Sequence, residues 1–145
     1  MAENEKNTKK TSVDISKFFT RENSEKGVWF EPEVNGKIGI EFLVIGAESN
    51  EAAEYLSDYD KAIDKINSEA DPKVRNEQTR VALATVTSKL VKNLRPAEGI
   101  DEIKIDGKPL SYSHDFVYEI MYNSITIADR IIRFSRKDSG FMKKK

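Results

Sequence analysis

"GVWFEPEVNGKIGIEFLVIG", residues 27–46, carries the strongest local structural signal in the chain. Asn35–Gly36 supplies the positive φ angles of a tight turn and lies between two runs rich in β-branched and aromatic residues. Apolar side chains alternate along both runs, as in half-buried strands. Pro32 has no N–H for a ladder, so the first strand is expected at a sheet edge or broken there. The stretch predicts an N-terminal β-hairpin over 28–45.

Two long helices are expected after this hairpin, over 50–67 and 72–93. Ser49 or Asn50 can cap the first helix, and Pro72 suits the first turn of the second. The short connection predicts an antiparallel helical hairpin. The apolar contacts expected from the 3.6-residue period are Ala52, Leu56, Tyr59, Ile63 and Ile66, followed by Val74, Val81, Leu83, Val86, Leu90 and Leu94.

The C-terminal third predicts a short second hairpin and further helices. Asp106–Gly107 is another hairpin-type turn, preceded by the alternating residues 103–105. Ser113 is a suitable cap for one helix, and Ser124 is a suitable cap for the next. Taken together, the segments predict a mostly helical α+β fold, in which a β-hairpin is followed by a helical hairpin, a short second hairpin and C-terminal helices.

The two ends of the chain are expected to differ from its middle. Residues 1–13 lack periodicity and predict a disordered arm, residues 14–138 a single domain, and residues 139–145 a basic tail. Asp14 is expected to cap a short helix, and the aromatic pair Phe18–Phe19 on that helix is expected to pin the arm to the core.

Charge is unevenly distributed in this chain of 145 residues, whose net charge is −1. Residues 129–145 carry +5, so residues 1–128 carry −6. A basic patch confined to one end argues against a general nucleic-acid binder, whose basic surface is usually broader. Two interpretations of this end stay open, phosphate binding and a solvated helix face. The candidate basic contacts are Arg130, Arg133, Arg136 and Lys137.

Few residues in the sequence are suited to catalysis. There is no cysteine, which excludes a thiolate nucleophile and thiolate metal ligands, and the one histidine is His114, beside an expected helix cap. A Ser-His-Asp arrangement would have to use that residue. The carboxylates are spread over solvated faces, and the seven glycines form no phosphate-binding loop. We expect a protein that is not an enzyme and that needs no cofactor or metal.

The sequence also predicts a soluble, cytoplasmic protein. No apolar run approaches the roughly 18 residues that suggest a membrane-spanning helix. The first residues, MAENEKNTKKTS, lack the apolar core of a signal peptide.

The order of these segments resembles the tail assembly chaperones of long-tailed, siphovirus-type bacteriophages, small proteins encoded just before the tape measure gene. The likeness spans most of residues 14–145. It is carried by DISKFFTRENSEKGVWFEPEVNGKIGIEFLVIG, by the two polar helices through SKLVKNLRP, by the KIDGKPLSYS turn, and by the ending IADRIIRFSRKDSGFMKKK.

The resemblance implies a largely helical, non-catalytic protein that binds and solubilises the tape measure protein and helps to recruit tail tube protein. It implies action in the host cytoplasm during assembly and absence from the mature virion. Many such chaperones also have a longer form made by programmed ribosomal frameshifting. The Lys143–Lys145 run then has two interpretations, a trace of a slippery A-rich message or a basic solubility tail.

A chaperone for a long helical client needs apolar grooves of moderate affinity, which the two long helices and the aromatic residues of the hairpin are expected to form. A homo-oligomer along the client would add avidity. Trp29 has two interpretations, an interface anchor or a half-buried hairpin residue. The candidate partner contacts are Trp29, Phe30, Tyr55 and Tyr59.

Two other functions stay open at this point. A small nucleic-acid-binding regulator would use the basic end, and its affinity would fall steeply with salt. A structural tail protein would remain in purified phage particles.

Overall fold

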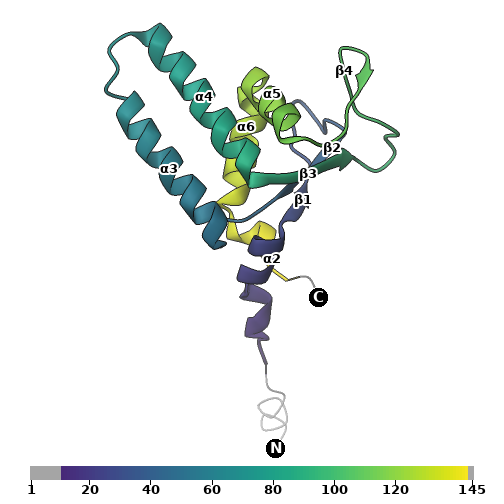
Figure 1. The fold of residues 1–145 in the computed structure, drawn as a ribbon. Helices are drawn as coiled ribbons and strands as arrows, with labels where there is room; N and C mark the ends of the chain where they lie inside the picture. Colours follow the sequence, from purple (N-terminus) through teal and green to yellow (C-terminus); the bar gives the residue numbers. More distant parts are fainter. Residues whose placement is uncertain (1–10, 144–145) are drawn as a thin grey trace, which may run out of the picture.

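The computed structural model describes residues 11–143, which form a mostly helical α+β fold and confirm the predicted fold class (Figure 1). Most of the expected N-terminal arm and the last two lysines lie outside the described residues. The 3-10 helices and α-helices are η1 (Ile15–Phe18), α2 (Arg21–Lys26), α3 (Asn50–Ile66), α4 (Pro72–Leu90), α5 (His114–Asn123), α6 (Ile125–Ser135) and η2 (Asp138–Phe141). The strands are β1 (Val28–Phe30), β2 (Ile40–Val44), β3 (Val91–Pro96), β4 (Lys104–Ile105) and β5 (Lys108–Pro109).

The N-terminal hairpin forms as expected, but its ladder is short. β1 pairs antiparallel with β2 along Val28–Phe30. Pairing stops before Pro32, which has no N–H to donate to the ladder. Farther along, Asn35 and Gly36 adopt φ angles of 55° and 108°, as a tight hairpin turn requires.

The main correction concerns the end of the second long helix. Helical periodicity predicts this helix through residue 93, but α4 ends at Leu90 and the chain continues directly into β3. β3 pairs antiparallel with β2, which places Leu94 opposite Phe42 in a sheet of order β1-β2-β3. This pairing gives β2 a partner on its second edge and buries Leu94. Local periodicity does not reveal a strand partner that lies far away in the sequence.

α3 and α4 form the predicted antiparallel helical hairpin, and Figure 1 shows them side by side. The Ser49 hydroxyl caps α3 by accepting a hydrogen bond from a backbone N–H of its first turn. The Asp71 carboxylate caps α4 in the same way, and Pro72 follows it. Both caps satisfy N–H groups that have no partner inside the helix.

The second hairpin and the C-terminal helices are confirmed as well. Asp106 and Gly107 form the turn between β4 and β5, with φ angles of 50° and 80°. Ser113 caps α5, and Ser124 both ends α5 and caps α6.

α4 lies at the centre of the helical part and packs against α3, α5 and α6. Its C-terminal half is buried on several sides, so polar residues such as Thr87 and Ser88 are buried there too. The Thr87 hydroxyl donates to the Leu83 carbonyl at 2.6 Å, which satisfies it inside the core. Val74 and Val81, which the helical period places among the apolar contacts, are each 40% exposed instead.

Three phenylalanines from distant parts of the chain form one closed cluster. The rings of Phe30 and Phe134 stack with centroids 4.1 Å apart, and Phe134 contacts Phe141 at 5.1 Å. Phe141 is 1% exposed, and its carbonyl accepts a hydrogen bond from Asn23 at 3.0 Å. The segment expected as a basic tail over 139–145 thus contributes Phe141 to the core.

The N-terminal aromatic pair does not pin the arm to the core. Asp14 caps η1 as expected, accepting the N–H of Ser16 at 3.0 Å. Ile15, Phe18 and Phe19 nevertheless remain exposed. α2, which the sequence did not predict as a separate helix, packs against η2.

Candidate functional site

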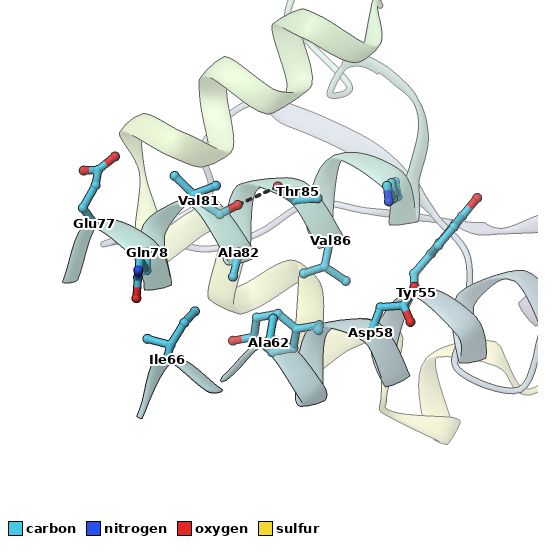
Figure 2. Close-up of a pocket in the computed structure, with 12 residues that line it drawn as sticks. Tyr55, Asp58, Ala62, Ile66, Glu77, Gln78, Val81, Ala82, Thr85 and Val86 are labelled. Atoms are coloured by element: carbon cyan, nitrogen blue, oxygen red, sulfur yellow. Dashed lines mark hydrogen bonds between the residues drawn. The ribbon is translucent and has the colours of Figure 1, made fainter. Parts of the chain in front are cut away.

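A groove of about 410 Å³ runs between α3 and α4 (Figure 2). One face of each helix lines it, and we call it the α3–α4 groove. Its apolar surface comes from Tyr55, Tyr59, Ala62, Ile66, Ala82 and Val86. The helix pair that the sequence predicts therefore leaves an open apolar surface between its members.

Small side chains explain why the α3–α4 groove stays open. Ala62 on α3 and Ala82 on α4 line facing sides of it, where a methyl group leaves space that a larger side chain would fill (Figure 2). Thr85 contributes a further methyl group, because its hydroxyl donates to the Val81 carbonyl at 2.7 Å. The groove surface consequently presents carbon atoms between the two helices.

Two of the four predicted partner contacts, Tyr55 and Tyr59, lie together in this groove. Burial raises the pKa of the Tyr59 phenol. The hydrogen bond that the Tyr55 hydroxyl donates to Glu51, at 2.7 Å, raises the pKa of Tyr55. Both phenols stay protonated at neutral pH, since the pKa of an ordinary tyrosine is already about 10. Lys89 and Lys92 lie 5.4 and 5.6 Å from the Tyr55 ring centroid, within cation–π range.

Charged side chains lie at both ends of the α3–α4 groove. Lys89 and Asp58 lie at the Tyr55 end. Glu77 lies at the Ile66 end (Figure 2), and its carboxylate accepts a hydrogen bond from the Tyr122 hydroxyl at 2.7 Å. An apolar floor with charges at its rim is suited to the apolar face of an amphipathic helix.

The other two predicted contacts, Trp29 and Phe30, lie elsewhere. Phe30 is half-buried in the phenylalanine cluster described above. Trp29 points to the opposite face of the sheet, where the Arg95 guanidinium lies 3.9 Å from its ring centroid and is itself paired with Glu41 at 2.7 Å. The half-buried hairpin position of Trp29 agrees with the packing interpretation.

The candidate basic contacts are largely engaged by acidic neighbours. Arg130 and Arg133 pair with Asp129 at 3.3 and 2.8 Å, and Arg136 pairs with Asp60 at 2.7 Å. Lys137 is exposed beyond the end of α6. These ion pairs reduce the positive potential that phosphate binding would need.

The single histidine does lie beside a serine. His114 Nε2 is 3.2 Å from the Ser88 hydroxyl, and His114 Nδ1 is 4.0 Å from the carboxylate of Asp115. Ser88 is 1% exposed and its hydroxyl also donates to the Thr85 carbonyl at 3.0 Å. A nucleophile must reach its substrate and needs a base that a third group orients, and this buried, differently bonded serine meets neither condition.

Residues 11–143 contain neither a candidate metal cluster nor a membrane-spanning helix. No cluster of three or more histidine, aspartate or glutamate side chains is arranged to hold a metal ion in that part of the chain. No helix there combines the length and the apolar composition needed to cross a membrane.

No protein-family model matches the chain, and no curated protein and no solved structure matches it significantly. A functional assignment therefore depends on the residues of the chain itself. The sequence interpretation missed Ala62, Ala82 and Thr85, because attention to large apolar residues overlooks positions where small ones leave room. Small residues that face each other across a predicted helical hairpin are the signal that would have found them.

Proposed function

We propose that this chain is a non-catalytic tail assembly chaperone of a long-tailed bacteriophage. In this proposal, the α3–α4 groove binds an amphipathic helical segment of the tape measure protein and keeps that protein soluble while tail tube subunits assemble around it. The observation that carries the proposal is the open apolar groove along the helical hairpin.

A helix fits this groove better than other ligands would. Two helices of 17 and 19 residues form its walls, so a third helix can lie along them as in a three-helix bundle. Charges on the rim add contacts to the client, since Lys89 attracts an acidic residue and Glu77, at the other end, attracts a basic one. Contacts of this kind are moderate in strength, which suits a partner that must later be released.

The identity of the client comes from the resemblance to tail assembly chaperones. That resemblance supports the tape measure protein and the tail tube protein as partners, the cytoplasm of the infected host as the location, and absence from the mature virion. The longer frameshifted form belongs to the same proposal.

The test is co-expression with the tape measure protein encoded next to this gene, followed by co-purification from the soluble fraction. Val81→Glu places a charge in the groove, and Val74→Glu is its matched control. Both valines are on α4 and each is 40% exposed, but only Val81 lines the groove.

We expect the wild type and Val74→Glu to keep the tape measure protein soluble, and Val81→Glu to recover less of it by about tenfold or more. If the tape measure protein stays insoluble with the wild type, the chaperone function is wrong. If both variants behave like the wild type, the client binds somewhere other than the α3–α4 groove.

A further inference from the structure

A second apolar surface lies at the start of the described chain. Val13, Ile15, Phe18 and Phe19 are 48% to 69% exposed, within a stretch of seven residues that we call the 13–19 segment. Large apolar side chains gathered in one exposed place usually mark a binding surface. The segment is therefore a candidate for an interaction outside its own fold.

The 13–19 segment is held in place although its apolar side chains face solvent. Asp14 caps η1, and the Lys17 carbonyl accepts a hydrogen bond from the Lys143 N–H at 3.2 Å. Thr20 follows the segment, is buried, and donates its hydroxyl to Glu48. Because both contacts fix the segment on the body, its apolar side chains form a persistent exposed surface.

The path of the chain directs this surface away from the groove of its own molecule. In Figure 1 the purple segment that precedes α2 extends from the body in the direction opposite to the α3–α4 loop. The contacts at Lys17 and Thr20 oppose a swing back towards α3. An apolar segment and an apolar groove on one chain, facing different directions, are suited to meet between copies.

We propose that the 13–19 segment of one copy binds in the α3–α4 groove of a second copy. The side chains of Ile15, Phe18 and Phe19 would supply the apolar volume that the groove leaves unfilled between its small residues. The charges correspond as well. At its Tyr55 end the groove offers Lys89 to Asp14 and Asp58 to Lys17.

Such a contact joins two different surfaces, so a pair of copies still presents one free segment and one free groove. Contacts of this type are heterologous and extend into rings or open chains, in contrast to a closed two-fold dimer. Association beyond the dimer is therefore expected as the protein concentration rises. This contact needs no client. A second consequence, which rests on the proposed function, is that a client helix and the 13–19 segment compete for one groove.

Two complementary variants test the contact. Phe18→Ser/Phe19→Ser removes the segment and keeps the groove, while Val81→Glu blocks the groove and keeps the segment. All three residues are at least 40% exposed, so neither variant removes a core side chain, and circular dichroism checks that each one folds. Sedimentation velocity is measured on the wild type, on each variant alone, on their equimolar mixture, and on the control Val74→Glu.

We expect the wild type and Val74→Glu to self-associate, each test variant alone to be monomeric, and the mixture to form a one-to-one heterodimer. Wild type that stays monomeric across the micromolar range overturns the proposal. Self-association of Val81→Glu alone would mean that two segments bind each other. Self-association of the double serine variant alone would mean that two grooves bind each other. Either result overturns the proposal. A mixture of the two variants that stays monomeric also overturns the proposal. None of these outcomes involves the tape measure protein, so this contact and the chaperone function can fail separately.

Discussion

The molecule contains two groups of phenylalanines that look alike in the sequence and differ in the fold. Phe134 stacks on Phe30 and contacts Phe141, where α6 meets both β2 and η2. Phe18 and Phe19 lie a few residues before the sheet and face solvent. Neither group is marked by its neighbours in sequence as buried or exposed.

The difference lies in what the rest of the chain supplies. Phe30 is covered because α6 brings Phe134 against it, and Phe134 is covered in turn by Phe141. Within residues 11–143, no comparable element covers Phe18 and Phe19. The proposed contact between copies would cover this pair. Substitutions in the two groups should consequently affect different properties.

The largest effect on stability is expected from Phe141→Ala. The substitution removes a ring that is 1% exposed and packed against Phe134, and it leaves a cavity in the closed cluster. We expect the free energy of unfolding, measured by urea titration, to fall by about 3–5 kcal/mol. Ile100→Ala, at a position 46% exposed, is the control and should change it by less than about 0.5 kcal/mol. Equal effects of the two substitutions would contradict the assignment of Phe141 to the core.

A second substitution, Gly140→Ala, is expected to overpack the phenylalanine cluster. A Cβ at Gly140 would lie 2.7 Å from Phe134 Cε1 and 2.9 Å from Phe134 Cζ, and the stacked ring has little freedom to move away. Gly140→Ala is expected to cost about 1–3 kcal/mol of unfolding free energy. The adjacent exposed position offers the matched control, Ser139→Ala. A neutral result for Gly140→Ala would show that Phe134 is loosely held.

The parts of the fold that the sequence predicts well are those with local causes. Asn35–Gly36 forms its turn, Ser49 and Ser124 cap their helices, and Pro72 begins α4. Each depends on the chemistry of one residue and its immediate neighbours. β3 depends on pairing with β2, a segment distant in sequence, and so a helical period over residues 91–93 was misleading.

Only two of the four predicted partner contacts lie in the candidate site, for the same reason. Tyr55 and Tyr59 belong to one helical face, so their proximity follows from the helical period. Trp29 and Phe30 are adjacent in a strand, and adjacent strand residues point to opposite faces, so the two could not have shared one surface. That rule was available from the sequence alone. The contact of Phe30 with Phe134 depends on the tertiary fold and was not.

A smaller effect is expected from Glu51→Gln, next to the open groove, where Glu51 accepts a hydrogen bond from Tyr55. Lys92 and the Tyr55 hydroxyl hydrogen-bond to Glu51 and hold its pKa below the ordinary value of 4.5. A lowered folded-state pKa contributes stability above the unfolded value, and the contribution is lost as the pH falls through the folded pKa. Since both side chains are more than a third exposed, the pair is worth only about 0.2–1 kcal/mol at neutral pH.

Urea titrations of the wild type and Glu51→Gln at several pH values measure this contribution. The two curves should differ at pH 7 and converge below pH 4.5, as Glu51 becomes protonated. Glu54→Gln, an exposed acid on the same helix, is the control. A difference between wild type and Glu51→Gln that persists unchanged at low pH would mean that packing, not charge, is responsible.

The smallest effect on the isolated fold is expected from Phe18→Ala/Phe19→Ala, and it separates the two phenylalanine groups most directly. Both rings are about half exposed, so in dilute solution the double variant should unfold within about 0.5 kcal/mol of the wild type. Any process that binds the folded state raises the apparent stability with concentration. If copies associate through these rings, the midpoint of wild-type thermal unfolding rises with protein concentration, and that of the double variant does not. A large loss of stability in dilute solution would instead show that Phe18 and Phe19 belong to the core, and the distinction between a closed and an open aromatic group would have to be given up.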